Sequence, residues 1–418
     1  MKIFLLTALI TSCIASAQSS KTTTEIMPAA YRTNVYVPML KGKRVAIFAN
    51  HTATIGNVHL VDTLLKLGIK IIVAFGPEHG FRGTANAGEK VDTYIDSITR
   101  IPVISLYGKK RKPSPEDLKN VDVMLFDIQD VGTRFYTYIS SLQEYMEAAF
   151  ENSKPLMILD RPNPNSFYVD GPVLDTAYKS FVGMNPIPIV YGMTMGEYAF
   201  MVAGEKWLSK KANDKYAYYQ TTKNSKDTAF HFQLIKCGNY THKSKYVLPI
   251  KPSPNLPDMA SIYWYGSNCF FEGTVLSEGR GTDHPFCFIG HPSLPSTLFA
   301  FTPVSRNGAT TPKLKDTLCY GVNLFGTNEQ VLRMVGNKVQ LKYLLEAYRL
   351  FPDKESFFIK VKKGNPNLSL FNKLAGNNEL MQQIKDGKTE EEIRASWQAK
   401  LDAFKKIRKK YLQYEDFE

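Results

Sequence analysis

Residues 75–83, FGPEHGFRG, bring a carboxylate, an imidazole and a guanidinium together in one short bend, as Glu78, His79 and Arg82. The bend follows the apolar run IKIIVA, which predicts a buried strand that ends here. The glycines between these residues permit positive φ angles. Titratable side chains on a bent loop behind a strand are typical of a functional site. Two alternatives stay open: Glu78 as a helix N-cap or partner of Arg82, and His79 as a hydrogen-bonded structural histidine.

Polar side chains follow three further predicted strands in the same way. They are Asn50 and His51 after the first strand, Asp127, Gln129, Asp130 and Arg134 after a central strand, and Asp160, Arg161 and Asn163 after the next. Ligands bind open parallel sheets at the carboxyl ends of the strands, so we expect these side chains to converge. In the alternative, the aspartates hold loops by accepting backbone N–H bonds, and the arginines neutralise them.

The elements that position these groups alternate along the chain. Strands are predicted at 44–50, 69–75, 101–108, 121–130 and 154–164, and helices at 59–68, 114–120, 135–153 and 193–208. Apolar strands separated by helices indicate an α/β fold, with a Rossmann-like parallel sheet covered on both faces. We expect this domain at 27–245 and a smaller mixed α/β domain, ending in a helix over 388–414, at 246–418. No G-x-G-x-x-G follows the first strand, so a dinucleotide site has no support.

A second group of charged residues lies in FEGTVLSEGRGTDHPF, residues 271–286. Glu272, Glu278 and Arg280 are separated by glycines, so this loop is predicted to close over the strand ends and bring a second carboxylate. In the alternative, it is a glycine-rich hairpin with an internal Glu–Arg pair.

The residue types limit the reactions that the predicted site could catalyse. No H-E-x-x-H or G-x-S-x-G occurs, so neither a metal site nor a serine nucleophile is favoured, and no cofactor is expected. Paired carboxylates remain: one protonates a leaving oxygen while the other stabilises or attacks the developing cation. This combination points to glycoside hydrolysis.

The N-terminus predicts export. MKIFLLTALITSCIASAQ has a basic residue, an apolar stretch and an A-x-A site, which favours a signal peptide over 1–17 and a periplasmic or secreted protein. ITSC also resembles a lipoprotein site, which would place a lipid anchor on Cys13 at the membrane surface. No later stretch is long enough to predict a transmembrane segment. The remaining four cysteines have no C-x-x-C spacing and are expected to be buried thiols.

The net charge of +13 indicates either a solvated basic surface or attraction to a polyanion. Without a recognisable binding module, no nucleic acid is expected as partner, and anionic cell-wall material is the more natural one.

The ordered motifs resemble one family. The chain contains, in this order, FGPEHGFRG, AGEKVD, VDVMLFDIQDVGTRFYTYISSL, LDRPNP, YGMTMGEYA, PSPNLP and FFEGTVLSEGRGTDHPF. Together, these motifs resemble the NamZ-type exo-β-N-acetylmuramidases, from about residue 40 to the C-terminus. This bacterial glycoside hydrolase family was formerly a domain of unknown function. The resemblance implies metal-independent release of terminal N-acetylmuramic acid from the non-reducing ends of peptidoglycan fragments, in a cleft between two domains.

The resemblance also implies roles for residues. Glu78 of the E-H-G motif is the expected catalytic group, with Glu278 as the preferred second group and Asp127 among those behind it. The residues expected to bind muropeptides or other N-acetylmuramic-acid-terminated glycans are Asn50, His51, His79, Arg82, Gln129, Asp130, Arg134, Tyr136, Arg161, Asn163, Asn255, Glu272 and Arg280.

The substrate chemistry adds one expectation. N-acetylmuramic acid carries a lactyl carboxylate, which an arginine should meet in bidentate fashion; Arg82, Arg134, Arg161 and Arg280 are the candidates. Its N-acetyl oxygen could act as an internal nucleophile, and the sequence does not separate this route from an enzyme nucleophile or from inversion. Three functional alternatives are another cell-wall hydrolase such as a metal-dependent amidase or esterase, a non-catalytic muropeptide-binding protein, and a surface adhesion protein.

Overall fold

The computed structural model describes residues 25–78, 80–82, 93–221, 231–361 and 363–418. The predicted signal peptide, Cys13 and His79 lie outside these ranges. Within them, none of the helices has both the length and the apolar character needed to cross a bilayer.

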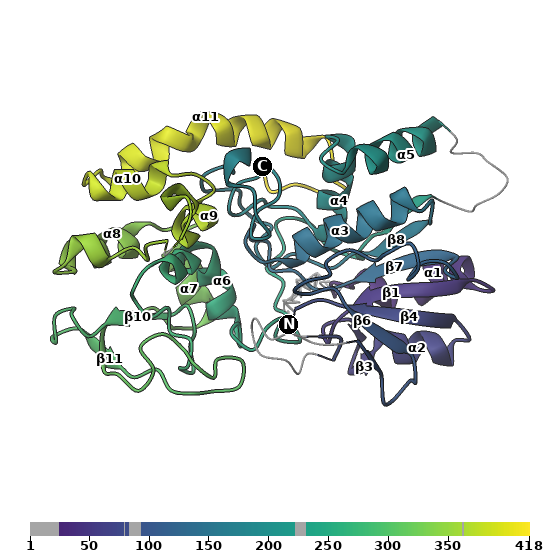
Figure 1. Cartoon of the computed structure of the whole chain (residues 1–418), viewed down its shortest axis with the longest axis horizontal. Coiled ribbons are helices and arrows are strands. Elements are labelled where there is room, and N and C mark those ends of the chain that lie inside the picture. Colours follow the sequence, from purple (N-terminus) through teal and green to yellow (C-terminus); the bar gives the residue numbers. More distant parts are fainter. Residues whose placement is uncertain (1–24, 79, 83–92, 222–230, 362) are drawn as a thin grey trace, which may run out of the picture.

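A seven-stranded sheet dominates the N-terminal part (Figure 1). Its strands, in spatial order, are β5 (Tyr94–Ile95), β6 (Pro102–Ser105), β4 (Lys70–Gly76), β1 (Arg44–Ala49), β7 (Val123–Asp127), β8 (Leu156–Leu159) and β9 (Phe232–Ile235). All neighbouring strands are parallel except β5 and β6. The predicted α/β fold with a parallel sheet is therefore confirmed.

Helices cover both faces of this sheet because its side chains alternate between two apolar clusters. Val45 and Ile47 pack in one cluster with α1 (Thr33–Leu40) and α2 (Leu60–Lys66). Ala46 and Phe48 pack in the other cluster with α3 (Tyr138–Glu151). Figure 1 shows α3 and α5 (Lys210–Thr221) above the sheet and α2 below it.

The C-terminal part joins the first through a shared core. It contains α6 (Met259–Asn268), η3 (Cys269–Gly273), an antiparallel sheet of β10 (Phe288–His291), β12 (Cys319–Asn323) and β11 (Phe299–Phe301), then α7 (Asn328–Val335), α8 (Lys342–Leu350), α9 (Leu370–Ala375), α10 (Glu379–Lys385) and α11 (Glu390–Lys409). One apolar cluster includes Leu142 of α3, Trp264 of α6 and Trp397 of α11. Figure 1 shows α11 running from the C-terminal part toward α4 (Met195–Gly204) and α5.

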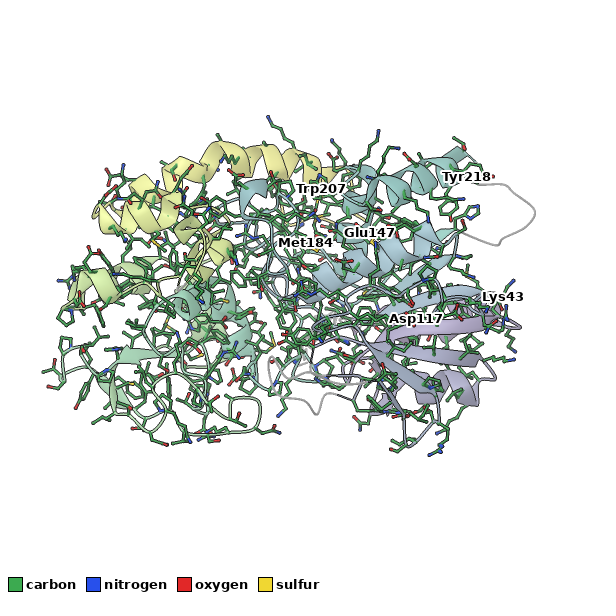
Figure 2. The ribbon with its side chains drawn as sticks, viewed as in Figure 1. Lys43, Asp117, Glu147, Met184, Trp207 and Tyr218 are labelled. Carbon is green, nitrogen blue, oxygen red and sulfur yellow. The ribbon has the colours of Figure 1, made fainter. Side chains whose placement is uncertain are left out.

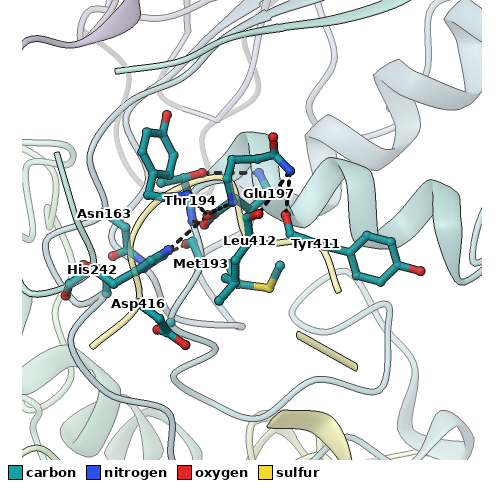
Figure 3. A network of polar contacts seen from close by, with 12 residues as sticks. Asn163, Met193, Thr194, Glu197, His242, Tyr411, Leu412 and Asp416 are labelled. Atoms are coloured by element: carbon teal, nitrogen blue, oxygen red, sulfur yellow. Dashed lines mark hydrogen bonds and ion pairs between the residues drawn. The ribbon is translucent and has the colours of Figure 1, made fainter. Parts of the chain in front are cut away.

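The chain end returns to the N-terminal part (Figure 3). Tyr414 donates its hydroxyl to Asp160 at 2.6 Å. The fully buried Glu197 lies 3.0 Å from His242 Nε2 and accepts the backbone N–H of Gln413 at 2.7 Å. Residues 411–418, named here the C-terminal strap, therefore belong structurally to the first half of the chain.

One predicted helix is wrong. Residues 114–120 form consecutive turns. Ser114 and Asp117 satisfy each other's groups as at a helix start, with Ser114 N donating to Asp117 at 2.7 Å. The chain then enters β7 within a few residues, so the turns have no room to extend into a helix, whose first turn is its costly step.

Two of the four basic residues in the run 109–112 pair with carboxylates, and Figure 2 labels two of these partners, Asp117 and Glu147. Lys110 pairs with Asp117, and Lys112 lies 3.0 Å from both Glu147 and Glu151. This part of the basic excess is therefore neutralised by the fold.

All four cysteines in the described ranges are buried free thiols, which confirms the expectation from their spacing.

Candidate active site

A polar cavity lies where the two parts of the chain meet. Its lining residues are Glu78, Phe135, Tyr136, Thr137, Tyr138, Ser253, Asn255, Leu256, Tyr265, Arg280 and Phe286. These come from the loop after β4, the start of α3, the 253–256 turn, α6 and the loop before β10. The cavity has a volume of about 70 Å³, below the usual range for small-molecule sites.

Glu78 is the sole carboxylate among the described lining residues. The Tyr107 hydroxyl donates to Glu78 Oε1 at 3.0 Å, and Thr137 Oγ1 lies 3.5 Å from Oε2. Burial, together with the Glu78 charge, raises the pKa of Tyr107 to about 12, so this hydroxyl keeps its proton and remains a donor. Gly80, with φ of +77°, turns the chain so that Phe81 packs into the apolar cluster below. The sequence positions Glu78 by this bend.

Arg280 is the cationic side chain among the described lining residues. It stands between Gly279 and Gly281, whose φ angles of +80° and +81° suit glycine. Arg280 Nη2 donates to Glu272 Oε1 at 2.6 Å, and Nε lies 3.4 Å from Glu278 Oε1. Burial disfavours the charge of Arg280, but these two carboxylates outweigh it and raise its pKa above the usual value.

Aromatic rings form much of the remaining wall. Tyr136 meets Tyr138 edge to face at 4.7 Å and Tyr265 at 5.9 Å, while Tyr265 meets Phe286 at 4.8 Å between ring centroids. The Tyr136 hydroxyl donates to Pro252 O at 2.9 Å, which ties the first turn of the α3 region to the 252–256 turn. Carbohydrate sites commonly combine such apolar faces with a few fixed polar groups.

Glu272 and Glu278 do not line the cavity, although the sequence predicted contact with substrate for both. The Glu278 side chain is 3% exposed and lies 2.8 Å from Lys313 Nζ as well as near Arg280. Glu272 is 23% exposed. Both carboxylates pair with Arg280 in this arrangement, and the role of Glu278 as the second catalytic group stays a prediction.

Asp127 and Arg161 form a buried ion pair away from the cavity lining. Arg161 Nη2 lies 2.8 Å from Asp127 Oδ2, with the two side chains 4% and 0% exposed. Asp127 is the last residue of β7 and has the same parity as Leu125, which faces α1 and α2. Neither residue is among the described residues that line the cavity, and their roles in catalysis and substrate binding stay predictions.

Arg134 is also structural. Its fully buried guanidinium donates to the carbonyl oxygens of Pro172, Ile187 and Leu374 at 2.7–2.8 Å. Burial lowers its pKa to about 9. It joins the two parts of the chain from inside the core instead of meeting a ligand.

The other predicted binding residues divide between cavity and scaffold. Tyr136 and Asn255 line the cavity, and Asn50 lies behind it, donating to the Tyr138 hydroxyl at 3.0 Å. The remaining predicted binding residues make contacts away from the cavity lining. Arg82 forms ion pairs with Asp62 and Asp96, and three others form hydrogen bonds with backbone oxygens: His51 with Lys251 O, Gln129 with Pro162 O, and Asn163 with Met193 O. Convergence at the sheet edge therefore holds for Glu78 and not for most of its neighbours.

Asp130 carries a buried carboxyl group and is not among the described residues that line the cavity. Its Oδ2 accepts bonds from Tyr191 and Gly132 N, while Oδ1 has no hydrogen-bond partner in the described part of the chain. Burial raises the pKa of Asp130 from 3.8 to about 7, against the effect of these hydrogen bonds.

This shift predicts a pH-dependent stability. Between pH 3.8 and about 7 the folded protein keeps a proton that the unfolded chain releases, so the Asp130 contribution to the free energy of unfolding falls as pH rises. The loss reaches about 4 kcal/mol, at roughly 1.4 kcal/mol per pKa unit. Asp130→Asn should therefore gain stability relative to the unmodified protein between pH 5 and pH 8 in urea titrations. The exposed Asp214→Asn is the control, and parallel pH dependences for Asp130→Asn and the unmodified protein would contradict the assignment.

Sequence reasoning missed several cavity residues. Thr137, Ser253, Leu256, Tyr265 and Phe286 are uncharged and carried no chemical signal. Lys313, which supports Glu278, lies 35 residues from it in a loop without a recognisable pattern. The glycines around Arg280 were the one local signal for that side of the site.

Two other candidate sites have weaker support. In the described ranges, no three His, Cys, Asp or Glu side chains are grouped closely enough to hold a metal ion. A depression over α5 is lined by Lys210, Lys211, Asp214, Lys215 and Tyr218, all on one helix, so it brings no separate elements together.

Comparisons with known proteins agree with this two-part architecture. Residues 45–260 match the family model "Exo-beta-N-acetylmuramidase NamZ, N-terminal", and residues 263–414 match its C-terminal counterpart. The chain is 40% identical over 396 residues to the "Peptidoglycan beta-N-acetylmuramidase NamZ" of Bacillus subtilis (strain 168), covering 91% of this chain and 89% of that protein.

Two solved structures are also similar. One DUF1343 family protein of Bacteroides fragilis superposes with a TM-score of 0.81 at 43% identity, over 94% of this chain and 100% of its own. Another from the same organism gives 0.71 at 28% identity, over 93% and 99%. The chain belongs to the NamZ exo-β-N-acetylmuramidase family of glycoside hydrolases.

Proposed function

We propose that the protein releases terminal N-acetylmuramic acid from the non-reducing ends of peptidoglycan fragments, with Glu78 as the catalytic acid. The observation that carries this proposal is the position of Glu78 in a cavity with aromatic walls between the two family-matched parts. The similarity to a peptidoglycan β-N-acetylmuramidase supports the substrate class. The N-terminal sequence features support action outside the cytoplasm, where peptidoglycan lies.

In this mechanism Glu78 protonates the glycosidic oxygen as the bond to the sugar breaks. Such proton transfer contributes about 10²–10⁴-fold to a rate. Tyr107 and Thr137 hold the carboxyl group toward the cavity. Because no second carboxylate lines the cavity among the described residues, we favour the N-acetyl oxygen of the substrate as the internal nucleophile.

The direct test is incubation with a para-nitrophenyl β-N-acetylmuramide, followed by NMR of the first product. We expect nitrophenol release and a β-anomer, since two displacements at one carbon retain configuration. Failure to release the sugar would overturn the function, and an initial α-anomer would overturn the internal-nucleophile route. Chelator-sensitive release of a stem peptide or acetyl group instead would favour an amidase or esterase.

Tyr107→Phe should lower kcat/KM about 10-fold. The change removes one hydrogen bond that orients the Glu78 carboxyl group, and a typical hydrogen bond contributes about 0.5–1.5 kcal/mol. Because the hydroxyl positions Glu78, the pH–rate profile should shift as well. Tyr218→Phe on α5 is the control; an unchanged profile with reduced stability would mean that Tyr107 has only a packing role.

A further inference from the structure

The loop that carries Arg280 is built to hold this one side chain in place. A Cβ at residue 279 would lie 2.6 Å from Phe288 O, and one at residue 281 would lie 2.5 Å from Val304 O. Both flanking positions therefore require glycine for space as well as for φ. The Arg280 guanidinium carbon lies 5.3 Å from the centre of the Phe286 ring, which adds a face for it to rest on.

Two carboxylates fix the orientation of the guanidinium. Glu272 accepts a hydrogen bond from Arg280 Nη2, and Glu278 lies near Arg280 Nε. Lys313 Nζ lies 2.8 Å from Glu278 and also donates to Phe271 O and Thr274 O. The cluster of Glu272, Glu278, Arg280 and Lys313 is formally neutral. Its internal pairs therefore balance its charges, and an added anion would depend on a hydrogen-bond donor that these pairs leave unused.

One edge of Arg280 is left for a ligand. No described residue accepts a hydrogen bond from its Nη1, and the side chain is 24% exposed and lines the cavity that also holds Glu78. By contrast, the guanidinium groups of Arg82, Arg134 and Arg161 are committed to scaffold acceptors away from the cavity lining.

We infer that Arg280 binds the lactyl carboxylate of N-acetylmuramic acid and thereby selects muramyl over glucosaminyl sugars. This inference rests on the proposed function. N-acetylmuramic acid differs from N-acetylglucosamine by this carboxylate-bearing ether, so the discriminating group must recognise an anion. A planar guanidinium with a free edge suits a carboxylate, and Glu272, Glu278 and Lys313 are positioning residues for it.

The test compares Arg280→Met with the unmodified protein on para-nitrophenyl β-N-acetylmuramide and β-N-acetylglucosaminide. We expect kcat/KM for the muramide to fall about 100-fold, as for loss of a charged hydrogen-bonded pair, with little change for the glucosaminide. A muramide whose lactyl carboxylate is a methyl amide should react poorly with the unmodified protein and be insensitive to the substitution. Arg306→Met, which removes an exposed arginine paired with Asp283, is the matched control.

A second variant keeps the inference testable if Arg280→Met does not fold. Glu272→Gln keeps the guanidinium but loosens its orientation, so it should raise KM for the muramide several-fold and leave the glucosaminide unaffected. Equal losses on both sugars in either variant would overturn the inference. If the unmodified protein cleaves neither sugar, the proposed function fails, and calorimetry with free N-acetylmuramic acid and N-acetylglucosamine then decides the role of Arg280: equal affinities would reject it.

Discussion

Glu78→Gln should lower kcat/KM for release of N-acetylmuramic acid from a muropeptide about 1,000-fold, with the fold intact. The amide fills the same space but cannot deliver a proton, and acid catalysis of this kind contributes about 10²–10⁴-fold. Glu78 is half-buried and sits on a loop, so the substitution leaves the core unchanged. Release of reducing sugar measures the rate, and thermal unfolding checks the fold.

A substrate with a better leaving group distinguishes proton donation by Glu78 from its other possible roles. A 2,4-dinitrophenyl muramide needs no proton to leave, so Glu78→Gln should slow its first turnover less than about 10-fold. The exposed Glu116→Gln is the control. An equally large loss on the dinitrophenyl substrate would contradict the acid role and make Glu78 a nucleophile or an electrostatic stabiliser.

Asp127→Asn should reduce the free energy of unfolding by about 3–5 kcal/mol, because it leaves the Arg161 guanidinium buried without a counter-charge. Arg161→Met should cost less. Burial already raises the pKa of Asp127, so its carboxyl group can take up a proton, whereas a guanidinium keeps its charge. Urea denaturation at pH 7 compares the two variants.

The double variant Asp127→Asn/Arg161→Met supplies the control for this pair. Replacing both members removes the unpaired charge, so stability should recover relative to Asp127→Asn alone. In every variant, activity per folded molecule should stay near that of the unmodified protein, because neither residue lines the cavity. A loss of turnover with unchanged stability would restore Asp127 to the catalytic group.

The sequence predicted the sheet well because its signals are local. Apolar strands with helices between them determined the parallel arrangement, and β1, β4, β7 and β8 lie where the pattern placed them. Glu78 and Arg280 were also local signals, since each combines a charge with glycines that bend the backbone. Both line the same cavity.

The sequence did not predict which way a side chain points or which distant loops are in contact. Position at a strand end says which edge of the sheet a residue occupies but not which way its side chain points. Asp127 follows the alternation of Val123 and Leu125 into the α1 and α2 side, where Arg161 meets it. The support of Glu278 by Lys313 links distant loops, and no local pattern encodes such a contact.

The C-terminal strap has a consequence for the order in which the protein is made. Asp160 and Glu197 lie near the middle of the given sequence, yet their partners Tyr414 and Gln413 follow them by 254 and 216 residues and are synthesised later. A nascent chain still held by the ribosome would carry these two buried carboxylates without those donors. The Rossmann-like half therefore completes these contacts only when residues 411–418 fold back onto it, so truncation of the C-terminal strap should destabilise the first half of the chain.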